Sequence, residues 1–255
     1  MRKIITLVFV LFSAVAYSQT PTSKRLSSGI DIGAGFKKDY LVPSFTYYEL
    51  LNLDANQTFS IGWTVRVGAF YAKNLDYITA PARLTREKTG FAALSAPLVE
   101  DNLDTMRFSR VSATSANLGV RAQIRLGPVE LGASADVIGF GFGKNRRGIY
   151  HSSTGMFMGA DTAGKEVKLS FSDHPTQYAQ PKRINTRLLG DNDQGALATE
   201  VYVRLLVMRR LGVRVSYQWI TTEMHASNEN IVTENQRFRN RASMVYVGLS
   251  FPFFK

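Results

Sequence analysis

Apolar and polar residues alternate along much of the chain. The segment 58–72 reads TFSIGWTVRVGAFYA, in which every second residue from Phe59 to Tyr71 is apolar. A period of two is typical of a β-strand that presents one apolar face. The segment is longer than the roughly 5–6 residues of most strands in globular proteins, and it exceeds the roughly 9–11 residues with which a tilted strand crosses a membrane.

The same pattern predicts eight strands. They cover residues 26–36, 40–50, 58–72, 114–126, 129–137, 197–207, 211–219 and 241–253. The second strand has the weakest pattern, and its Pro43 removes a donor from the ladder. After Val137 the apolar positions shift by one residue, which predicts a β-bulge. The run GFGFGK at 139–144 is interpreted as the end of this strand, because it lacks the Gly-Lys-Ser/Thr ending and the helix of a phosphate loop.

The lengths of the predicted connections alternate. Short links lie near 37–39, 51–57, 127–128 and 208–210, whereas long links cover 73–111, 143–195 and 222–240. From the second strand onward, short turns fall at the end of the molecule that holds the termini and long loops at the other. This asymmetry and the even strand number predict an all-β fold, a closed antiparallel eight-stranded transmembrane β-barrel with long extracellular loops. Within the longest loop, GMFMGADTAGKEVKLSF is compatible with a hairpin too short to cross lipid.

The N-terminus has the pattern of an export signal. Arg2 and Lys3 precede the apolar stretch 4–12, and Ala16 and Ser18 supply small residues at the positions that guide cleavage. We therefore predict a signal peptide at 1–18, cleaved after Ser18, and an outer-membrane barrel domain at 19–255. The alternative is an N-terminal membrane anchor, but the apolar stretch is shorter than the roughly 17–25 residues of a spanning helix.

Composition then excludes several classes of protein. The chain has no Cys, which excludes a disulfide-stapled mini-protein and a Cys-ligated metal site. A mean hydropathy of −0.09 argues against a polytopic helical membrane protein but suits a barrel, in which each outward apolar residue has a polar neighbour pointing inward. The net charge of +11 suggests a nucleic-acid partner, yet an exported protein does not meet one.

If the apolar face of each strand meets lipid, charged residues fill the lumen. These are Asp31, Glu130, Asp136 and Glu200, with Arg66, Arg121, Arg125, Arg204 and Arg214. Four acids against five Arg are nearly balanced, so ion pairs are expected to plug a lumen about one side-chain layer wide. The alternative is a gated, porin-like path for ions or solutes.

Aromatic residues are expected to form two girdles at the membrane interfaces, where amphipathic rings prefer to lie. The first group contains Phe59, Phe251, Phe253 and either Tyr47 or Tyr48; the second contains Phe36, Tyr40, Tyr71 and Trp219.

In its strand number, its connection lengths and its C-terminal MVYVGLSFPFF, the chain resembles the small eight-stranded outer-membrane barrels of Gram-negative bacteria, the group that includes the OmpA transmembrane domain and OmpX. That C-terminal stretch resembles the final-strand signal read by the barrel-assembly machinery. Two departures are Pro252 and the terminal Lys255, which stands where an aromatic residue is usual. The resemblance implies a bacterial outer-membrane location and contact with the assembly machinery during insertion.

One short motif suggests an enzyme. His225-Ala226-Ser227-Asn228 resembles the His-x-Ser-Asn stretch of outer-membrane lipid A 3-O-deacylases, in which His and Ser act with a Glu. Both His225 and Ser227 keep the outward parity of Trp219, and Glu223, Glu229 or Glu234 are candidates to orient the His. A four-residue match is weak, and the Gly/Asn pattern that surrounds it in the family is missing here.

The long loops are the expected place of function. Basic residues such as Arg146 and Arg147 are candidates to bind phosphates of lipopolysaccharide, the alternative being a solvated loop. The three His are far apart in the sequence, so we expect no metal site and no cofactor. We predict a non-enzymatic envelope protein that contacts outer-membrane lipid and an envelope protein partner; the alternatives are the deacylase and a transport or secretion component.

Overall fold

The computed structural model describes residues 25–153, 156–160, 163, 165–170, 176–188, 191–227 and 236–253. The predicted signal peptide and its cleavage site lie outside these ranges, as do His174, Glu229, Glu234 and Lys255. No helix within the described ranges is long and apolar enough to cross a membrane.

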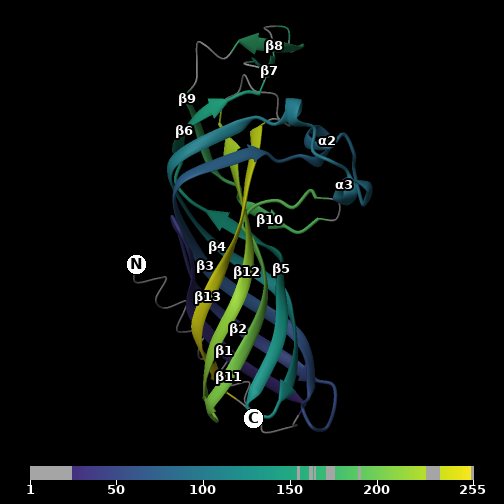
Figure 1. Cartoon of the computed structure of the whole chain (residues 1–255), viewed down its shortest axis with the longest axis vertical. Helices are drawn as coiled ribbons and strands as arrows, with labels where there is room; N and C mark the ends of the chain where they lie inside the picture. The colour runs from purple at the N-terminus through teal and green to yellow at the C-terminus, as the bar shows by residue number, and fades with distance from the viewer. Residues whose placement is uncertain are drawn as a thin grey trace.

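Eight long antiparallel strands form a closed ring of hydrogen-bonded pairs (Figure 1). They are β1 (Leu26–Lys37), β2 (Tyr40–Asn52), β3 (Phe59–Thr79), β4 (Thr105–Leu126), β5 (Val129–Phe142), β11 (Leu197–Met208), β12 (Leu211–Ala226) and β13 (Arg237–Pro252). The ring runs from β1 to β5 in chain order, continues through β11 and β12 to β13, and closes where β13 pairs with β1. The predicted all-β class and the eight antiparallel strands are confirmed.

The predicted bulge in β5 is also confirmed. Leu118 of β4 pairs with Ile138, and the next residue, Gly119, pairs with Asp136, so Val137 has no partner position of its own. Both Val137 and Ile138 are exposed, and Gly139 returns to the inner face. The predicted extension of β5 to the glycine-rich run is therefore correct.

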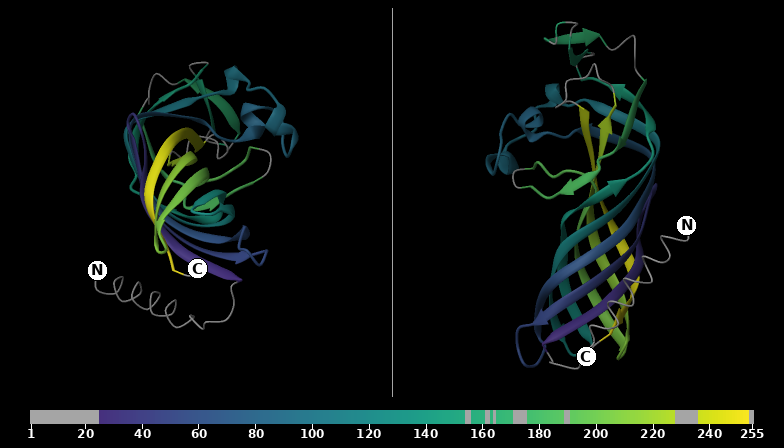
Figure 2. Two further views of the ribbon diagram at one scale, coloured as in Figure 1. Left: turned by 60° about the horizontal axis from the view of Figure 1, so that its bottom comes forward. Right: turned by 180° about the vertical axis from the view of Figure 1, so that it is seen from behind.

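Four strands continue well beyond the predicted ends and build a second ring. In this upper ring, β3 pairs with β4, β4 with β6 (Arg146–His151), β6 with β9 (Thr176–Pro181), β9 with β12, β12 with β13, and β13 with β3. The ring has six strands, and Figure 2 shows from a second side how these strands extend past the eight-strand ring.

The predicted loops were therefore too long, because strands occupy parts of 73–111, 143–195 and 222–240. β3 continues to Thr79 and β4 begins at Thr105, with Leu75 opposite Phe108 and Tyr77 opposite Met106. The alternation in the sequence is interrupted at Asn74, whose φ is 51°. This break shifts the inward parity by one residue and hides the continuation of the strand from a periodicity analysis.

The connections beyond the upper ring are short elements. The segment between β3 and β4 contains α2 (Ala82–Thr85), α3 (Ala92–Ser95) and the 3-10 turn η1 (Glu100–Asn102). Between β5 and β11 lie β10 (Ile184–Thr186), which pairs with β5, and a separate hairpin of β7 (Met156–Ala160) and β8 (Glu166–Ser170). This hairpin is the one suggested by the sequence.

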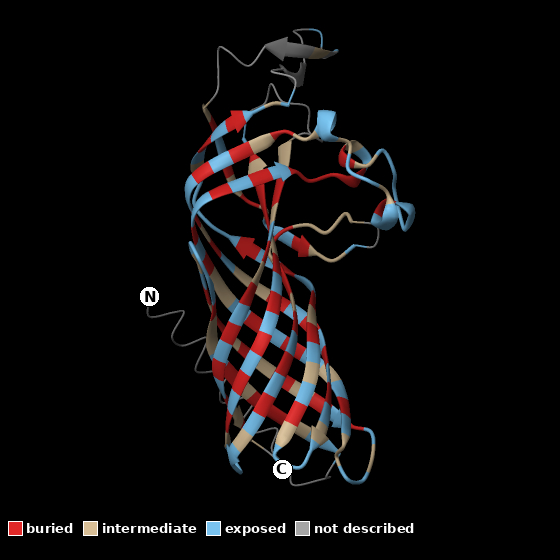
Figure 3. Cartoon of the chain, in the orientation of Figure 1, coloured by how far each residue is buried: buried red, intermediate tan, exposed pale blue. Residues whose placement is uncertain are grey.

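The two rings bury different kinds of residue, and Figure 3 shows where the buried positions lie in each ring. In the eight-strand ring, large apolar side chains are exposed on the outer face and polar ones are buried inside. We call these outward residues the apolar belt; they include Phe59, Ile61, Trp63, Leu118, Val120, Leu131, Val201, Val203, Val215, Tyr217, Val247 and Leu249. Inside the upper ring a core of large apolar side chains is buried, formed by Tyr77, Met106, Phe108, Tyr150, Met224 and Phe238, together with the polar Gln177 and Thr222.

Candidate functional site: the charged interior of the eight-strand ring

Acidic and basic side chains alternate in space through the eight-strand ring. The order is Glu130, Arg204, Asp31, Arg214, Glu200, Arg66 and Asp136, each in an ion pair with the next, and Arg121 joins at Asp31. We call these eight residues the polar network. Four carboxylates meet four guanidinium groups, so the buried formal charge of the network sums to zero.

Asp31 is the centre of the network. Its carboxylate accepts hydrogen bonds from Arg121 Nη1 at 2.7 Å and from Arg214 Nη1, and Arg204 Nη1 lies 3.6 Å from its second oxygen. Ser250 of β13 donates to that second oxygen. Asp31 is fully buried, so these partners replace the water that a carboxylate otherwise needs.

Glu200 and Asp136 share Arg66 nearer the upper ring. Glu200 Oε1 accepts from Arg66 Nη2 and Arg214 Nη2, each at 2.6 Å, and from Ser134 Oγ at 2.7 Å. Asp136 accepts from Arg66 Nε at 3.2 Å and from the backbone N–H of Ala198 at 2.9 Å. Both carboxylates thus have at least three donors, which is the condition under which a buried charge is tolerated.

Tyrosine rings fill the space between the guanidinium groups. The guanidinium carbon of Arg121 lies 4.2 Å from the ring centre of Tyr48 and 4.5 Å from that of Tyr202, and Arg214 lies 4.1 Å from Tyr202. The Tyr202 hydroxyl accepts from Arg121 Nε at 2.6 Å and donates to Gln123 Oε1 at 2.9 Å. These cation–π and hydrogen-bond contacts hold the Arg side chains where the carboxylates do not reach.

Glycines on the inner face make room for these rings. A Cβ on Gly132 would lie 2.3 Å from the ring of Tyr202, and one on Gly29 would lie 2.3 Å from the Tyr48 hydroxyl. These inward positions are therefore closed to larger residues.

Gly132→Ala should lower the free energy of unfolding by about 1–3 kcal/mol, because the new methyl group forces Tyr202 off its position between Arg121 and Arg214. Gly68→Ala is the matched control, since its nearest neighbours would lie 3.4 Å away, an ordinary contact. Urea titration of both variants in lipid vesicles measures the difference. Equal midpoints for the two variants would show that the ring interior is loosely packed.

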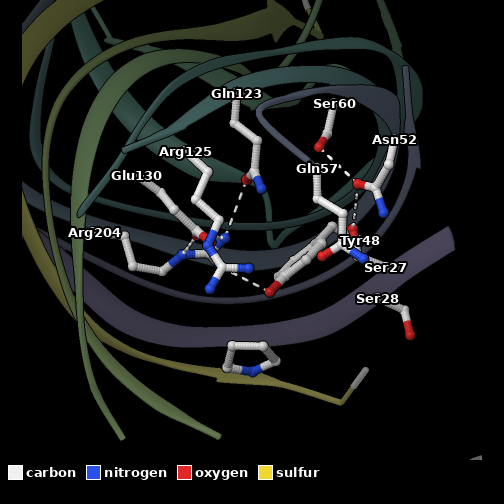
Figure 4. A pocket seen from close by; sticks show the side chains of 11 residues that line it. Ser27, Ser28, Tyr48, Asn52, Gln57, Ser60, Gln123, Arg125, Glu130 and Arg204 are labelled. Carbon is white, nitrogen blue, oxygen red and sulfur yellow. Dashed lines mark hydrogen bonds and ion pairs between the residues drawn. The ribbon is translucent and has the colours of Figure 1, made fainter. Parts of the chain in front are cut away.

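Cavities bordering the network are small. The first, shown in Figure 4, is lined by Arg204, Glu130, Tyr48 and their neighbours and has a volume of about 20 Å³. The second lies toward the upper ring beside Arg66 and Asp136 and has the same volume. Each holds about one water molecule. Above the second cavity the apolar core of the upper ring begins, so the network is covered from that side.

The structure places eight of the nine predicted lumen residues in this network. Arg125 is the exception: it lies at the mouth near the turn between β4 and β5, its side chain is 30% exposed, and its Nε is 3.9 Å from Glu130. The groups that support the network were not predicted from the sequence; the main ones are Tyr48, Gln123, Tyr202, Tyr246 and Ser250. The signal in the sequence that could have identified them is their position on the inward-facing side of each strand's alternation. Tyr48 lies inside the ring, so Tyr47 is the outward member of that pair.

The suggested catalytic motif lies at the far end of β12, in the upper ring. His225 is half-buried and pairs across the sheet with Arg237 and Gln180, and Ser227 is exposed with its backbone N–H bonded to Tyr178 O. Burial, followed by the nearby Lys182 cation, lowers the pKa of His225 below its usual value. Both oxygens of Glu223 accept from Arg237, at 2.7 and 3.1 Å, so this Glu is already engaged by a cation.

The other predicted binding groups are separated. Arg146 and Arg147 are neighbours on β6, so they point to opposite faces of the strand: Arg146 donates to Ser112 and Arg147 to Thr176. Within the described part of the chain, His, Asp and Glu side chains form no group of three or more that suits a metal ion.

No protein-family model matches the sequence, and no curated protein sequence matches it. Among solved structures, the chain is similar to the outer-membrane protein Ail of Yersinia pestis, with 11% identity and a TM-score of 0.34 over 89% of this chain and 99% of Ail. It is also similar to the outer-membrane protease OmpT of Escherichia coli, with 10% identity and a TM-score of 0.33 over 92% and 100% of the two chains. The toluene transporter TbuX of Ralstonia pickettii gives 9% identity and a TM-score of 0.26 over 84% and 67%. These are distant likenesses to the fold of outer-membrane β-barrels.

Proposed function

We propose that the chain is an integral outer-membrane β-barrel with a closed lumen, which holds the upper ring above the membrane as a rigid surface for contacts. The observation that carries this proposal is that large apolar side chains are exposed around the eight-strand ring but form the buried core of the upper ring. A protein surface of apolar side chains is favourable in lipid, whereas a protein in water buries its apolar side chains. The reversal therefore supports a boundary between lipid and water at the junction of the two rings.

The dimensions of the apolar belt support this proposal. On β3 the outward apolar residues run from Phe59 to Tyr71 and on β12 from Val213 to Trp219. These lengths bracket the roughly 9–11 residues of a tilted transmembrane strand. A water-soluble protein rarely exposes an apolar surface larger than a few hundred Å², whereas this belt surrounds the ring.

The closed lumen is proposed from the polar network. Arg121, Arg204 and Arg214 are each about 1% exposed, and the bordering cavities hold about one water each. A hydrated path for ions or solutes needs a continuous water column, which these side chains occupy. The proposed role is therefore non-conducting. The proposal also takes the protein as non-enzymatic, with outer-membrane lipid, lipopolysaccharide or an envelope protein as partner. Export is proposed to depend on the signal at 1–18, and insertion on the barrel-assembly machinery.

Purified protein in planar lipid bilayers should show no stable conductance steps. The ion pairs Arg214–Glu200 and Arg66–Glu200 fill the interior of the ring, each with an N–O distance of 2.6 Å. The matched variant is Arg66→Ala with Glu200→Ala, which removes one side chain of each charge and opens space while leaving the remaining network neutral. Conductance in this variant alone supports a plug, whereas large, stable steps in the unaltered protein contradict it.

A further inference from the structure

A gradient of residue types crosses the outer face of β12 and β13 where the apolar belt ends. Cross-strand pairs along this face change from Tyr217 with Val245, to Trp219 with Ser243, to Thr221 with Arg241. Beyond these rows Glu223 pairs with Arg239 and His225 with Arg237. The face therefore passes from apolar to charged within two rows above Trp219.

A cavity lies at this transition. It has a volume of about 410 Å³, far larger than the cavities inside the ring, and it opens on the outside of the sheet. Trp219, Thr199 and Ser243 line it on the sheet side, and Arg187, Asp193 and Arg241 supply its charged groups. Such a volume lies within the range typical of small-molecule sites.

The connections above the belt form a wall beside this cavity. The segment before β11 and the segment with α2 and α3 project from the same side of the molecule (Figures 1 and 2). They are joined by the ion pair between Arg86 Nε and Asp191 Oδ2 at 3.0 Å, and by the Ala82 N–H, which donates to Asn192 Oδ1. Arg239 Nη1 donates to Asp191 O at 2.8 Å, which fixes this wall to β13.

Cations exceed anions around the cavity. Among the described residues, the lining itself holds Arg187 and Arg241 against Asp193. Behind it Arg86, Arg237 and Arg239 meet Asp191 and Glu223, so the whole cluster has an excess of two positive charges. The side chain of Arg241 remains 50% exposed and that of Arg187 33% exposed despite their ion pairs. Arg187 also donates from Nε to Asp136 O at 2.7 Å and from Nη2 to Ala198 O at 3.4 Å, so Arg241 has the more available donors and Arg187 adds the second N–H of each Nη.

We propose that this cavity binds the anionic phosphate headgroup of a membrane lipid, whose acyl chains lie along the apolar belt below Trp219. The inference rests on the proposed membrane location of the belt and adds a ligand to it. Arg241 and Arg187 donate to the phosphate oxygens, Thr199 and Ser243 face the linker region, and the Trp219 ring lies at the level where headgroup and acyl chain meet.

Binding is measured with full-length protein in an uncharged detergent, in a Trp63→Phe background that leaves Trp219 as the single Trp. The probe is a soluble dihexanoyl phosphatidic acid. It should change Trp219 fluorescence saturably, whereas dihexanoylglycerol, which lacks the phosphate, and inorganic phosphate, which lacks the chains, should not at the same concentration. An equal response to inorganic phosphate overturns the lipid assignment in favour of a free-anion site.

Two charge variants test the assignment in opposite directions. Arg241→Gln should weaken the apparent affinity about fivefold, and Asp193→Asn should strengthen it by a similar factor. Arg107→Gln is the control, because this exposed Arg lies on β4 and pairs with Asp76, away from the cavity. Unchanged affinity in both variants overturns the inference. If such variants still insert into vesicles, the proposed membrane role stands without the lipid site; failure of the unaltered protein to insert removes both.

Discussion

Asp31→Asn should lower the free energy of unfolding by about 3–5 kcal/mol, the usual cost of removing one partner from a buried ion pair. Asn has nearly the same shape as Asp, so the loss reflects charge. Arg121, Arg204 and Arg214 all lie within ion-pair distance of the Asp31 carboxylate, and each would keep its charge in the interior without that counterion. Urea unfolding in lipid vesicles, followed by Trp fluorescence, measures the change.

The matched control for this variant is Asp76→Asn. Asp76 receives two hydrogen bonds from Arg107, at 2.6 and 2.7 Å, but both side chains are largely exposed, so the loss should stay below about 1 kcal/mol. A double variant adds a second check: Arg121→Met should cost less with Asn at position 31 than with Asp, because the cation has lost its partner. Equal costs for Asp31→Asn and Asp76→Asn would contradict a network that holds the ring together.

Val203→Arg should destabilise the protein in a bilayer by about 2–4 kcal/mol, the cost of a cation facing lipid near the bilayer midplane. Val203 points outward from β11 and pairs with Val215 and Leu131, at the middle of the apolar belt. The measurement is urea unfolding in vesicles, and the comparison is a substitution to Arg at an equally exposed position in the upper ring.

Ile149→Arg is that comparison. Ile149 is 48% exposed on β6, the same fraction as Val203, but it lies in the upper ring. There an Arg meets water, and the neighbouring Arg107 adds only a small cross-strand repulsion, so the change should stay within about 1 kcal/mol. Similar losses in the free energy of unfolding at both positions would mean that the outer faces of the two rings lie in the same environment, which would contradict the lipid location of the apolar belt.

The sequence was sufficient to predict the eight ring strands because most of them have one apolar and one polar face within the eight-strand ring; β2 has the weakest alternation. The inward position of Asp31, Arg66 and Glu200 follows from the same parity. The alternation does not show which Arg forms an ion pair with which carboxylate. Arg204 and Asp31, for example, are far apart in the chain and are brought together only by the closure of the ring.

The upper ring was missed for a different reason. Inward apolar residues begin at Phe70 and Ala72, and at Asn74 the inward parity of β3 shifts by one residue, so that Leu75 and Tyr77 continue the buried core. β6 and β9 have six residues each and gain their hydrogen-bond partners from strands distant in sequence. Such short strands are specified by long-range pairing, which local alternation does not reveal.

The most direct test of the proposed membrane location of the eight-strand ring uses spin labels on single Cys residues, since the chain has no Cys of its own. Labels at Val203, Val215 and Val247 report on the apolar belt, and labels at Ile149 and Tyr178 report on the upper ring. In vesicles, the belt labels should collide readily with oxygen and be shielded from a water-soluble nickel chelate, and the upper-ring labels should show the reverse. Belt labels as accessible to the nickel chelate as those of the upper ring would contradict the account.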